Sequence, residues 1–291
     1  MKYRVRHITN YSYRDLVPLC QNQAHLLPRV FDRQQCESTR VTVQPEPTAM
    51  KSWVDYFGNS ALHFAVEVPH DELTVTAESI VTVTPPRLPA PSATPPWEQV
   101  RDATKTSLDD KSVQFTFASP LIRLIDEARD YARPSFSPGR PLLEAALDLT
   151  GRIFREFKYD PEATCVNTPT EEVFRLRRGV CQDFAHLEIT CLRSMGLAAR
   201  YVSGYLLTEP PPGQTKLVGA DASHAWLAVY CPQLRTWFDL DPTNNQMPQL
   251  RHVTLAWGRD YSDVCPIKGV FLGGGEHRMY VSVDVAPTGD N

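Results

Sequence analysis

Three kinds of side chain that together can carry out acyl transfer follow one another along the chain. Cys181 stands at the start of a predicted helix, and His224 stands at the start of a predicted strand. The next predicted strand supplies two carboxylates, Asp239 and Asp241. A thiol nucleophile, a histidine base and a carboxylate that orients the histidine can form a thioester from an amide and then resolve it. The order of these residues therefore predicts a cysteine-dependent acyl-transfer site.

Cys181 has a different setting from the other six cysteines. It follows Gly179 at a predicted helix N-terminus, where free backbone N–H groups and the helix dipole favour a thiolate. The predicted apolar stripe of this helix consists of Val180, Phe184, Leu187, Cys191 and Met195. Cys181 lies one residue off this stripe, at the edge of the core, whereas Cys191 lies on it and is expected to pack. Most cysteines are structural, so Cys181 supports catalysis only together with the histidine and the carboxylate.

His224 and Trp226 share one face of their predicted strand, because side chains alternate between the two faces. The indole would then flank the imidazole and could shield it from water. An ordinary core tryptophan and a hydrogen-bonded structural histidine are the alternative interpretations. Neither residue identifies a site by itself.

The length of the hairpin loop after this strand selects between the two carboxylates. A four-residue loop at 231–234 would place Trp226 opposite Asp239 and His224 opposite Asp241. The other register, His224 opposite Asp239, needs a two-residue Cys-Pro loop with a positive φ that cysteine tolerates badly. We therefore predict Asp241 as the residue that orients His224, and Asp239 as a neighbour.

Charge and hydropathy exclude several classes of function. The net charge of −4 and the isoelectric point near 6.1 argue against a general nucleic-acid binder, which needs a basic face. No stretch approaches the roughly 18 consecutive apolar residues of a membrane helix, and the N-terminus lacks a signal-peptide pattern. We expect a cytoplasmic protein that binds neither nucleic acid nor membrane; the sequence does not predict its oligomeric state.

The cysteines indicate neither a disulfide framework nor a metal site. Seven cysteines, an odd number without paired spacing, leave at least one free thiol, and we expect most to be small buried residues. A zinc site from Cys181, His186 and Cys191 is disfavoured, because five residues of helix turn the second ligand by about 140° from the first. No acidic loop suggests calcium. We therefore expect no metal and no other cofactor.

The chain divides into a β-rich first part, a proline-rich connector and an α+β second part. Residues 1–84 show two-residue alternation broken by turn residues, which predicts an antiparallel β domain. Six prolines in 85–96 predict a stiff linker over 85–115. Residues 116–291 are predicted to form the catalytic core.

Within this core, helices precede strands. Helices are predicted from Ser119-Pro120 to Ala132, from near Pro141, and from Gly179 or Cys181 to about Met195, where Gly196 ends the last one. Strands are predicted over 199–206, 225–230, 236–240 and 279–285. The predicted fold class is α+β: an N-terminal antiparallel β domain followed by helices packed on an antiparallel sheet.

Several segments resemble the motifs of the bacterial transglutaminase-like family, whose members are also described as cysteine proteases. In the second part of the chain they are Gly-Val-Cys-Gln-Asp-Phe-Ala at 179–185, Ser-His-Ala-Trp at 223–226, Asp-Pro-Thr-Asn at 241–244, and the segments 200–205 and 258–261. The first 70 or so residues, including 53–59, resemble the β-rich domain that often precedes the family's core. The resemblance therefore covers nearly the whole chain.

This resemblance implies a papain-like core and a mechanism acting on a peptide or protein substrate. Cys181 would attack an amide carbonyl, His224 would serve as base and then as acid, and Asp241 would fix the imidazole. The backbone N–H of Cys181 is one candidate donor to the oxyanion, while a second donor is not assigned. Asp183 is expected only to cap or brace the helix.

Other functions fit parts of the same evidence. Arylamine N-acetyltransferases use a similar Cys-His-Asp set, but Asp-Pro-Thr-Asn and the N-terminal β domain favour the transglutaminase-like family. A non-catalytic peptide-binding or scaffold module is a further alternative, against which the complete triad counts. Water as the second nucleophile gives peptide or isopeptide hydrolysis, and an amine gives cross-linking. We favour hydrolysis, because water is always present and no dedicated lysine site is visible.

Overall fold

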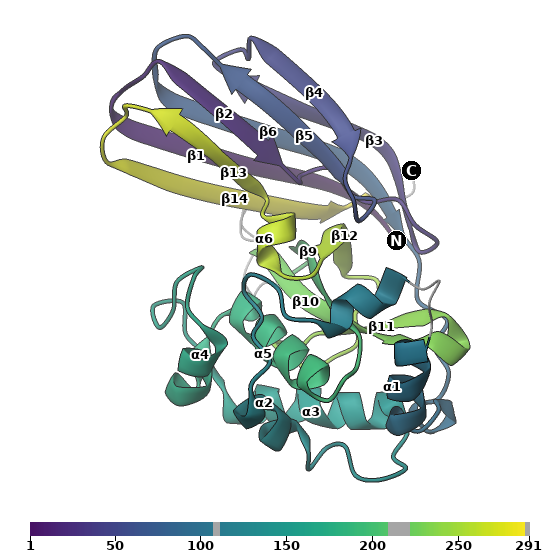
Figure 1. The fold of residues 1–291 in the computed structure, drawn as a ribbon. Coiled ribbons are helices and arrows are strands. Elements are labelled where there is room, and N and C mark those ends of the chain that lie inside the picture. Colours follow the sequence, from purple (N-terminus) through teal and green to yellow (C-terminus); the bar gives the residue numbers. More distant parts are fainter. Residues whose placement is uncertain (107–110, 209–221, 289–291) are drawn as a thin grey trace, which may run out of the picture.

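The computed structural model describes residues 1–106, 111–208 and 222–288. Two parts are stacked on each other: a β-sandwich, and a core in which a sheet carries helices (Figure 1). This is the predicted α+β architecture, with an N-terminal antiparallel β domain followed by a transglutaminase-like core. In the described part of the chain, no helix combines the length and hydrophobicity needed to cross a membrane.

The sandwich consists of two four-stranded sheets, with strand orders β14-β1-β6-β3 and β13-β2-β5-β4. The strands from the first part of the chain are β1 Lys2–Val17, β2 Leu19–Ala24, β3 Gln34–Gln44, β4 Ala49–Val54, β5 Ser60–Val66 and β6 His70–Val83. In β1, Val5 and His7 are buried whereas Arg4 and Arg6 are exposed, so the two-residue alternation of the sequence marks the inner face.

The last two strands correct the predicted extent of the catalytic core. Both β13 (Ile267–Leu272) and β14 (His277–Pro287) belong to the sandwich, where β13 pairs with β2 and β14 with β1. The strand predicted over 279–285 exists, but it extends the first sheet rather than the core sheet. The apolar alternation of this segment predicts a strand but does not specify its partner. The partner, β1, lies at the other end of the sequence, and local patterns do not encode so distant a pairing.

The predicted linker at 85–115 contains regular structure. The proline-rich stretch is largely extended, but helix α1 covers Trp97–Thr106 and short 3-10 helices cover Pro91–Ala93 and Lys111–Thr116. The linker residues 107–110 lie outside the described part of the chain.

Of the three predicted helices, two begin where the sequence indicates. Helix α3 (Leu142–Glu156) follows Pro141, and α5 (Cys181–Ser194) begins at the candidate nucleophile. The helix predicted from Ser119-Pro120 is shorter: α2 covers Asp126–Ala132. The chain turns between Ser119 and Ile122 instead, and the backbone N–H of Leu121 donates to the carboxylate of Asp260. Additional helices are α4 (Thr170–Leu176) and α6 (Tyr261–Val264), and two short strands, β7 (Lys158–Tyr159) and β8 (Arg178–Gly179), pair in parallel.

The core sheet has the strand order β11-β10-β9-β12. Its strands are β9 Ala199–Leu206, β10 Ala222–Cys231, β11 Thr236–Leu240 and β12 His252–Gly258. Helix α5 lies against this sheet, with α2 and α3 on its other side (Figure 1). Residues 183–194 of α5 are all buried, so the first turn of α5 is its only turn that reaches the surface. The buried helix therefore fixes the position of its N-terminus relative to the sheet.

Two buried amide side chains attach the sandwich to the edge strand β12. Gln34 accepts from the backbone N–H of Thr254 at 2.8 Å and donates to its carbonyl at 2.7 Å. Asn59 makes the same pair of bonds with Trp257, both at 2.9 Å. These amides bond backbone groups at the edge of β12, where the backbone N–H of Arg29 also donates to the Thr254 carbonyl, and they hold the two parts of the protein together.

Gly204 leaves no room for a side chain between β9 and its neighbours. A Cβ atom at this position would lie 2.1 Å from the carbonyl oxygen of Val253 and 2.6 Å from the ring of Trp226. His224 is the β10 partner of Gly204, so the glycine allows the indole to pack beside the candidate base.

We predict that Gly204→Ala lowers the free energy of unfolding by about 2 kcal/mol or more, because backbone and indole must both move. Urea denaturation followed by tryptophan fluorescence measures this change. The matched control is Gly151→Ala in α3, where the added methyl group meets only the side-chain ends of Arg155 and Asn245. The control should stay within about 1 kcal/mol of the wild type, because alanine favours the helix; an equal loss in both variants would contradict the packing argument.

Candidate active site

Cys181 is the first residue of α5 and is partly exposed. The helix start is held by Asp183, whose carboxylate accepts from the backbone N–H of Val180 at 2.8 Å and from the hydroxyl of Thr164 at 2.6 Å. A side chain at Gly179 would collide with that carboxylate, since its Cβ would lie 2.6 Å from Oδ2. Asp183 therefore braces the helix, as the sequence analysis expects. Cys191 is fully buried, and all seven cysteines are free thiols.

His224 and Asp241 form the predicted contact, with 2.8 Å between Nε2 of the imidazole and Oδ2 of the carboxylate. Both side chains are buried. Cys181 lines the same cavity as this imidazole and contributes to raising its pKa. Because Nε2 is occupied by Asp241, Nδ1 is the ring nitrogen left for the sulfur. The structure thus brings together the three residues that the sequence predicts.

The strand register behind this contact differs from the prediction. Cys231 pairs with Thr236 and Leu227 with Leu240, which shifts the pairing by two residues from the predicted one. The loop occupies 232–235 rather than 231–234, because Arg235 adopts a left-handed conformation with φ 49° and closes the turn. Asp241 therefore lies just beyond the paired strand and reaches His224 diagonally instead of facing it directly.

Five hydrogen bonds hold the Asp241 carboxylate, which is completely buried. Oδ1 accepts from the backbone N–H groups of Thr243 at 3.0 Å and Asn244 at 3.2 Å. Oδ2 accepts from His224 at 2.8 Å, from the Asn244 amide at 2.8 Å and from Nε2 of His252 at 3.0 Å. Burial would raise the pKa of Asp241, but the hydrogen bonds from the two histidines hold it below its usual value. The carboxylate is therefore ionised at neutral pH.

His252 and Asn244 are site residues that the sequence analysis misses. Asn244 belongs to the Asp-Pro-Thr-Asn motif, but nothing in the sequence assigns it a role. His252 begins β12, which is separated from β10 by β9, so only the sheet order brings it to Asp241. Burial lowers the pKa of His252 despite its bond to Asp241, which favours the neutral ring as donor.

The pKa of His224 is shifted in the opposite direction. Burial alone would lower it, but hydrogen bonds to Asp241 and Cys181, together with the negative charges of these groups, raise it above the usual value of 6.5. Trp226 shields the pair: its ring centre lies 6.0 Å from that of His224 and 5.1 Å from that of His252. The arrangement therefore favours a protonated imidazole at His224.

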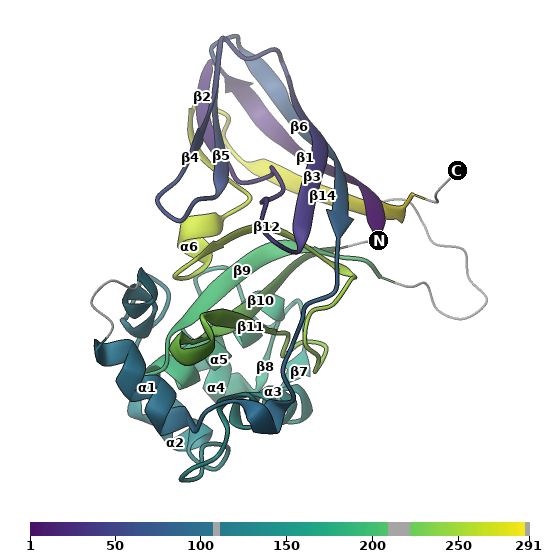
Figure 2. The same cartoon turned by 90° about the vertical axis from the view of Figure 1, so that its right-hand side faces the viewer.

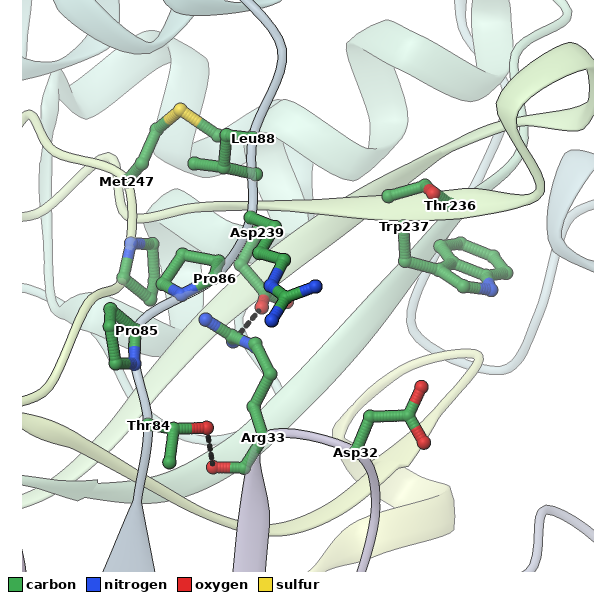
Figure 3. A pocket seen from close by; sticks show the side chains of 12 residues that line it. Asp32, Arg33, Thr84, Pro85, Pro86, Leu88, Thr236, Trp237, Asp239 and Met247 are labelled. Carbon is green, nitrogen blue, oxygen red and sulfur yellow. Dashed lines mark hydrogen bonds and ion pairs between the residues drawn. The ribbon is translucent and has the colours of Figure 1, made fainter.

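Asp239, the other carboxylate on β11, faces a different cavity. Its Oδ2 lies 2.7 Å from Nη2 of Arg33, at the junction with the sandwich (Figure 3). That cavity has a volume of about 450 Å³ and is also lined by Pro85 and Pro86 of the connector. Asp239 is thus a structural ion-pair partner rather than a member of the cysteine site.

The described residues contain one set of three side chains close enough to share a metal ion: His224, Asp241 and His252. Both histidines already use Nε2 to bond the same carboxylate oxygen, so a metal would have to replace these hydrogen bonds. The zinc set weighed from the sequence does not converge. Nε2 of His186 accepts from the backbone N–H of Tyr261 at 3.2 Å, and Cys191 packs in the hydrophobic core.

Two family models match this chain. Residues 3–82 match the model of the bacterial transglutaminase-like N-terminal region, and residues 129–242 match that of the transglutaminase-like superfamily. An uncharacterized protein of Mycobacterium tuberculosis is 43% identical, with 98% of this chain and 93% of the relative covered. One of Mycobacterium leprae is 32% identical, with 98% of both chains covered.

A solved structure shares the whole architecture. It belongs to a Cytophaga hutchinsonii protein proposed to be a cysteine protease, and the match covers 100% of this chain and 92% of that chain. The TM-score is 0.75 at 18% sequence identity, which shows a common fold. The chain belongs to the transglutaminase-like superfamily and carries its bacterial N-terminal region.

Proposed function

We propose that this protein is a cysteine-dependent acyl-transfer enzyme that hydrolyses amide bonds in a peptide or protein, through a thioester on Cys181. The observation that carries the proposal is that Cys181 and His224 line one cavity while the imidazole of His224 bonds the buried carboxylate of Asp241. Cys181 is the nucleophile, His224 the base and then the acid, and Asp241 the residue that orients the ring.

The two half-reactions follow from this arrangement. His224 accepts the thiol proton, the sulfur attacks the carbonyl carbon, and the backbone N–H of Cys181 donates to the oxyanion. Collapse of the tetrahedral intermediate breaks the C–N bond, and the departing amine takes the proton from His224. Water then attacks the thioester while His224 removes its proton. The acid is released, and the sulfur regains a proton.

Transamidation is the alternative outcome, and it differs only in the second nucleophile. Hydrolysis is the simpler proposal because water needs no binding site. A scaffold that only binds peptides is the non-enzymatic alternative. The complete set of Cys181, His224 and Asp241 argues against it, because a passive groove does not need a thiol beside an oriented imidazole.

We predict that His224 titrates above 6.5 and His252 below it, and that Asp241→Asn lowers the pKa of His224. Because the folded-state pKa of His224 exceeds the unfolded value, its stabilisation is complete below pH 6.5 and is lost as the pH rises through the folded pKa. Nuclear magnetic resonance titration of the imidazole C–H signals measures all three values. A His224 pKa at or below 6.5 in the wild type would contradict stabilisation of the protonated ring by Asp241.

We predict that Cys181→Ala loses at least about a thousandfold of turnover, because no other group replaces the nucleophile. A diverse peptide library is incubated in ¹⁸O-water with a biotinylated alkylamine, and products are counted by mass spectrometry. If hydrolysis dominates, more products should carry ¹⁸O in a new carboxyl group than carry the biotinylated alkylamine. Cys36→Ala, a partly buried thiol in the sandwich, is the matched control and should retain activity. Turnover that survives in Cys181→Ala would refute the mechanism.

A further inference from the structure

One face of the β14-β1-β6-β3 sheet has three different neighbours along its length. At one end, Val5 and its β14 partner Val285 pack against the core sheet, where they meet Tyr205, Val253 and Leu255. At the other end, the same face of β1 continues through Tyr13, which packs against the second sheet of the sandwich. Figure 2 shows this sheet extending across the top of the core.

Between these two ends, the face lines the cavity of the candidate active site. Thr9 pairs with Val281 and Tyr11 with Met279, and all four line the cavity of about 330 Å³ that also contains Cys181 and His224. Met279 is 59% exposed and Val281 is 40% exposed, although both lie on the apolar face of the sheet. Within the described part of the chain, the middle of the face thus lacks the cover that both ends have.

Apart from the reacting pair Cys181 and His224, the wall of the cavity lacks charged side chains. Its described lining residues include no aspartate, glutamate, lysine or arginine, and Tyr201, Tyr261 and Ile267 also line it. His7 closes the end next to the domain junction, and its Nε2 bonds Thr9 at 2.7 Å. Burial lowers the pKa of His7 to about 4, so this ring is neutral at physiological pH. A charged group entering here would lose hydration without gaining a partner.

We propose that the β1–β14 face is the specificity wall of the enzyme, and that it binds a large apolar or aromatic side chain next to the reacting carbonyl of a peptide substrate. This inference rests on the proposed function, because it places the substrate at Cys181. The N-terminal domain would then select substrates, with Thr9, Tyr11, Met279 and Val281 in contact with the bound side chain. Such contact removes the exposed apolar surface of the face from water.

The test measures equilibrium binding, so that it does not depend on turnover. The full chain carrying Cys181→Ala is titrated into fluorescent peptides that alternate Gly with Phe, Leu, Asp or Lys, and anisotropy gives the affinities. Because the test residue recurs at every second position, one copy can reach the wall wherever along its length the peptide binds. We expect the Phe and Leu peptides to bind about tenfold tighter than the charged ones, as burial of one large apolar side chain implies.

Charge substitutions on the wall should redirect this preference. Val281→Asp should weaken binding of the Phe peptide about tenfold, and it should bind the Lys peptide more tightly than the Asp peptide. Met279→Lys should bind the Asp peptide more tightly than the Lys peptide. The matched control is Tyr280→Asp. Tyr280 lies on the same strand with its side chain on the opposite face, where it is 66% exposed, so this variant should keep the wild-type order of peptide affinities.

Equal affinities for all four peptides, or an unchanged order in both Val281→Asp and Met279→Lys, would overturn the specificity wall. The outcome is separate from that of the proposed function. If the peptides show no preference but Cys181-dependent turnover is intact, the specificity wall is refuted and the proposed function is kept. If the preference follows these substitutions but the wild type shows no turnover, the wall is supported and the protein is a binding module rather than an enzyme.

Discussion

Two histidines from strands that are not neighbours donate to the same buried oxygen, Oδ2 of Asp241. His224 comes from β10 and His252 from β12, with β9 between them, so the carboxylate at the end of β11 ties together two strands that are not neighbours. Removing one donor would leave a buried charge less satisfied, which costs more than the bond itself contributes. Gly204 on β9 leaves room for Trp226 beside the two rings. The site and the sheet therefore depend on one another.

The second constraint is the position of the sandwich. Its last strand, β14, is supplied by the end of the chain, after the core has been completed, and it pairs with the first strand. β1 and β14 thus build one sheet, and residues of both strands line the cavity that contains Cys181. Gln34 and Asn59 fix the sandwich on β12 through paired amide bonds. The cavity is therefore lined by both regions that the family models match.

The sequence predicts local features well and distant pairings poorly. The start of α5 and the His224–Asp241 contact are predictable, because helix signals are local and β10 and β11 are joined by a short loop. The exact register is not, because Arg235 adopts a left-handed conformation that non-glycine residues seldom take. His252 and the placement of β13 and β14 depend on which strands become neighbours, and no local pattern encodes that choice. The cytoplasmic location remains a prediction.

If His224 activates Cys181, the effect appears in the rate of iodoacetamide labelling against pH, read for each cysteine by peptide mass spectrometry. We expect Cys181 to be labelled faster than the other six cysteines well below the free-thiol pKa of about 8.5, and His224→Ala to abolish this advantage. Labelling of Cys181 at the same rate as the other cysteines, or labelling unaffected by the loss of His224, would show that His224 does not activate the thiol.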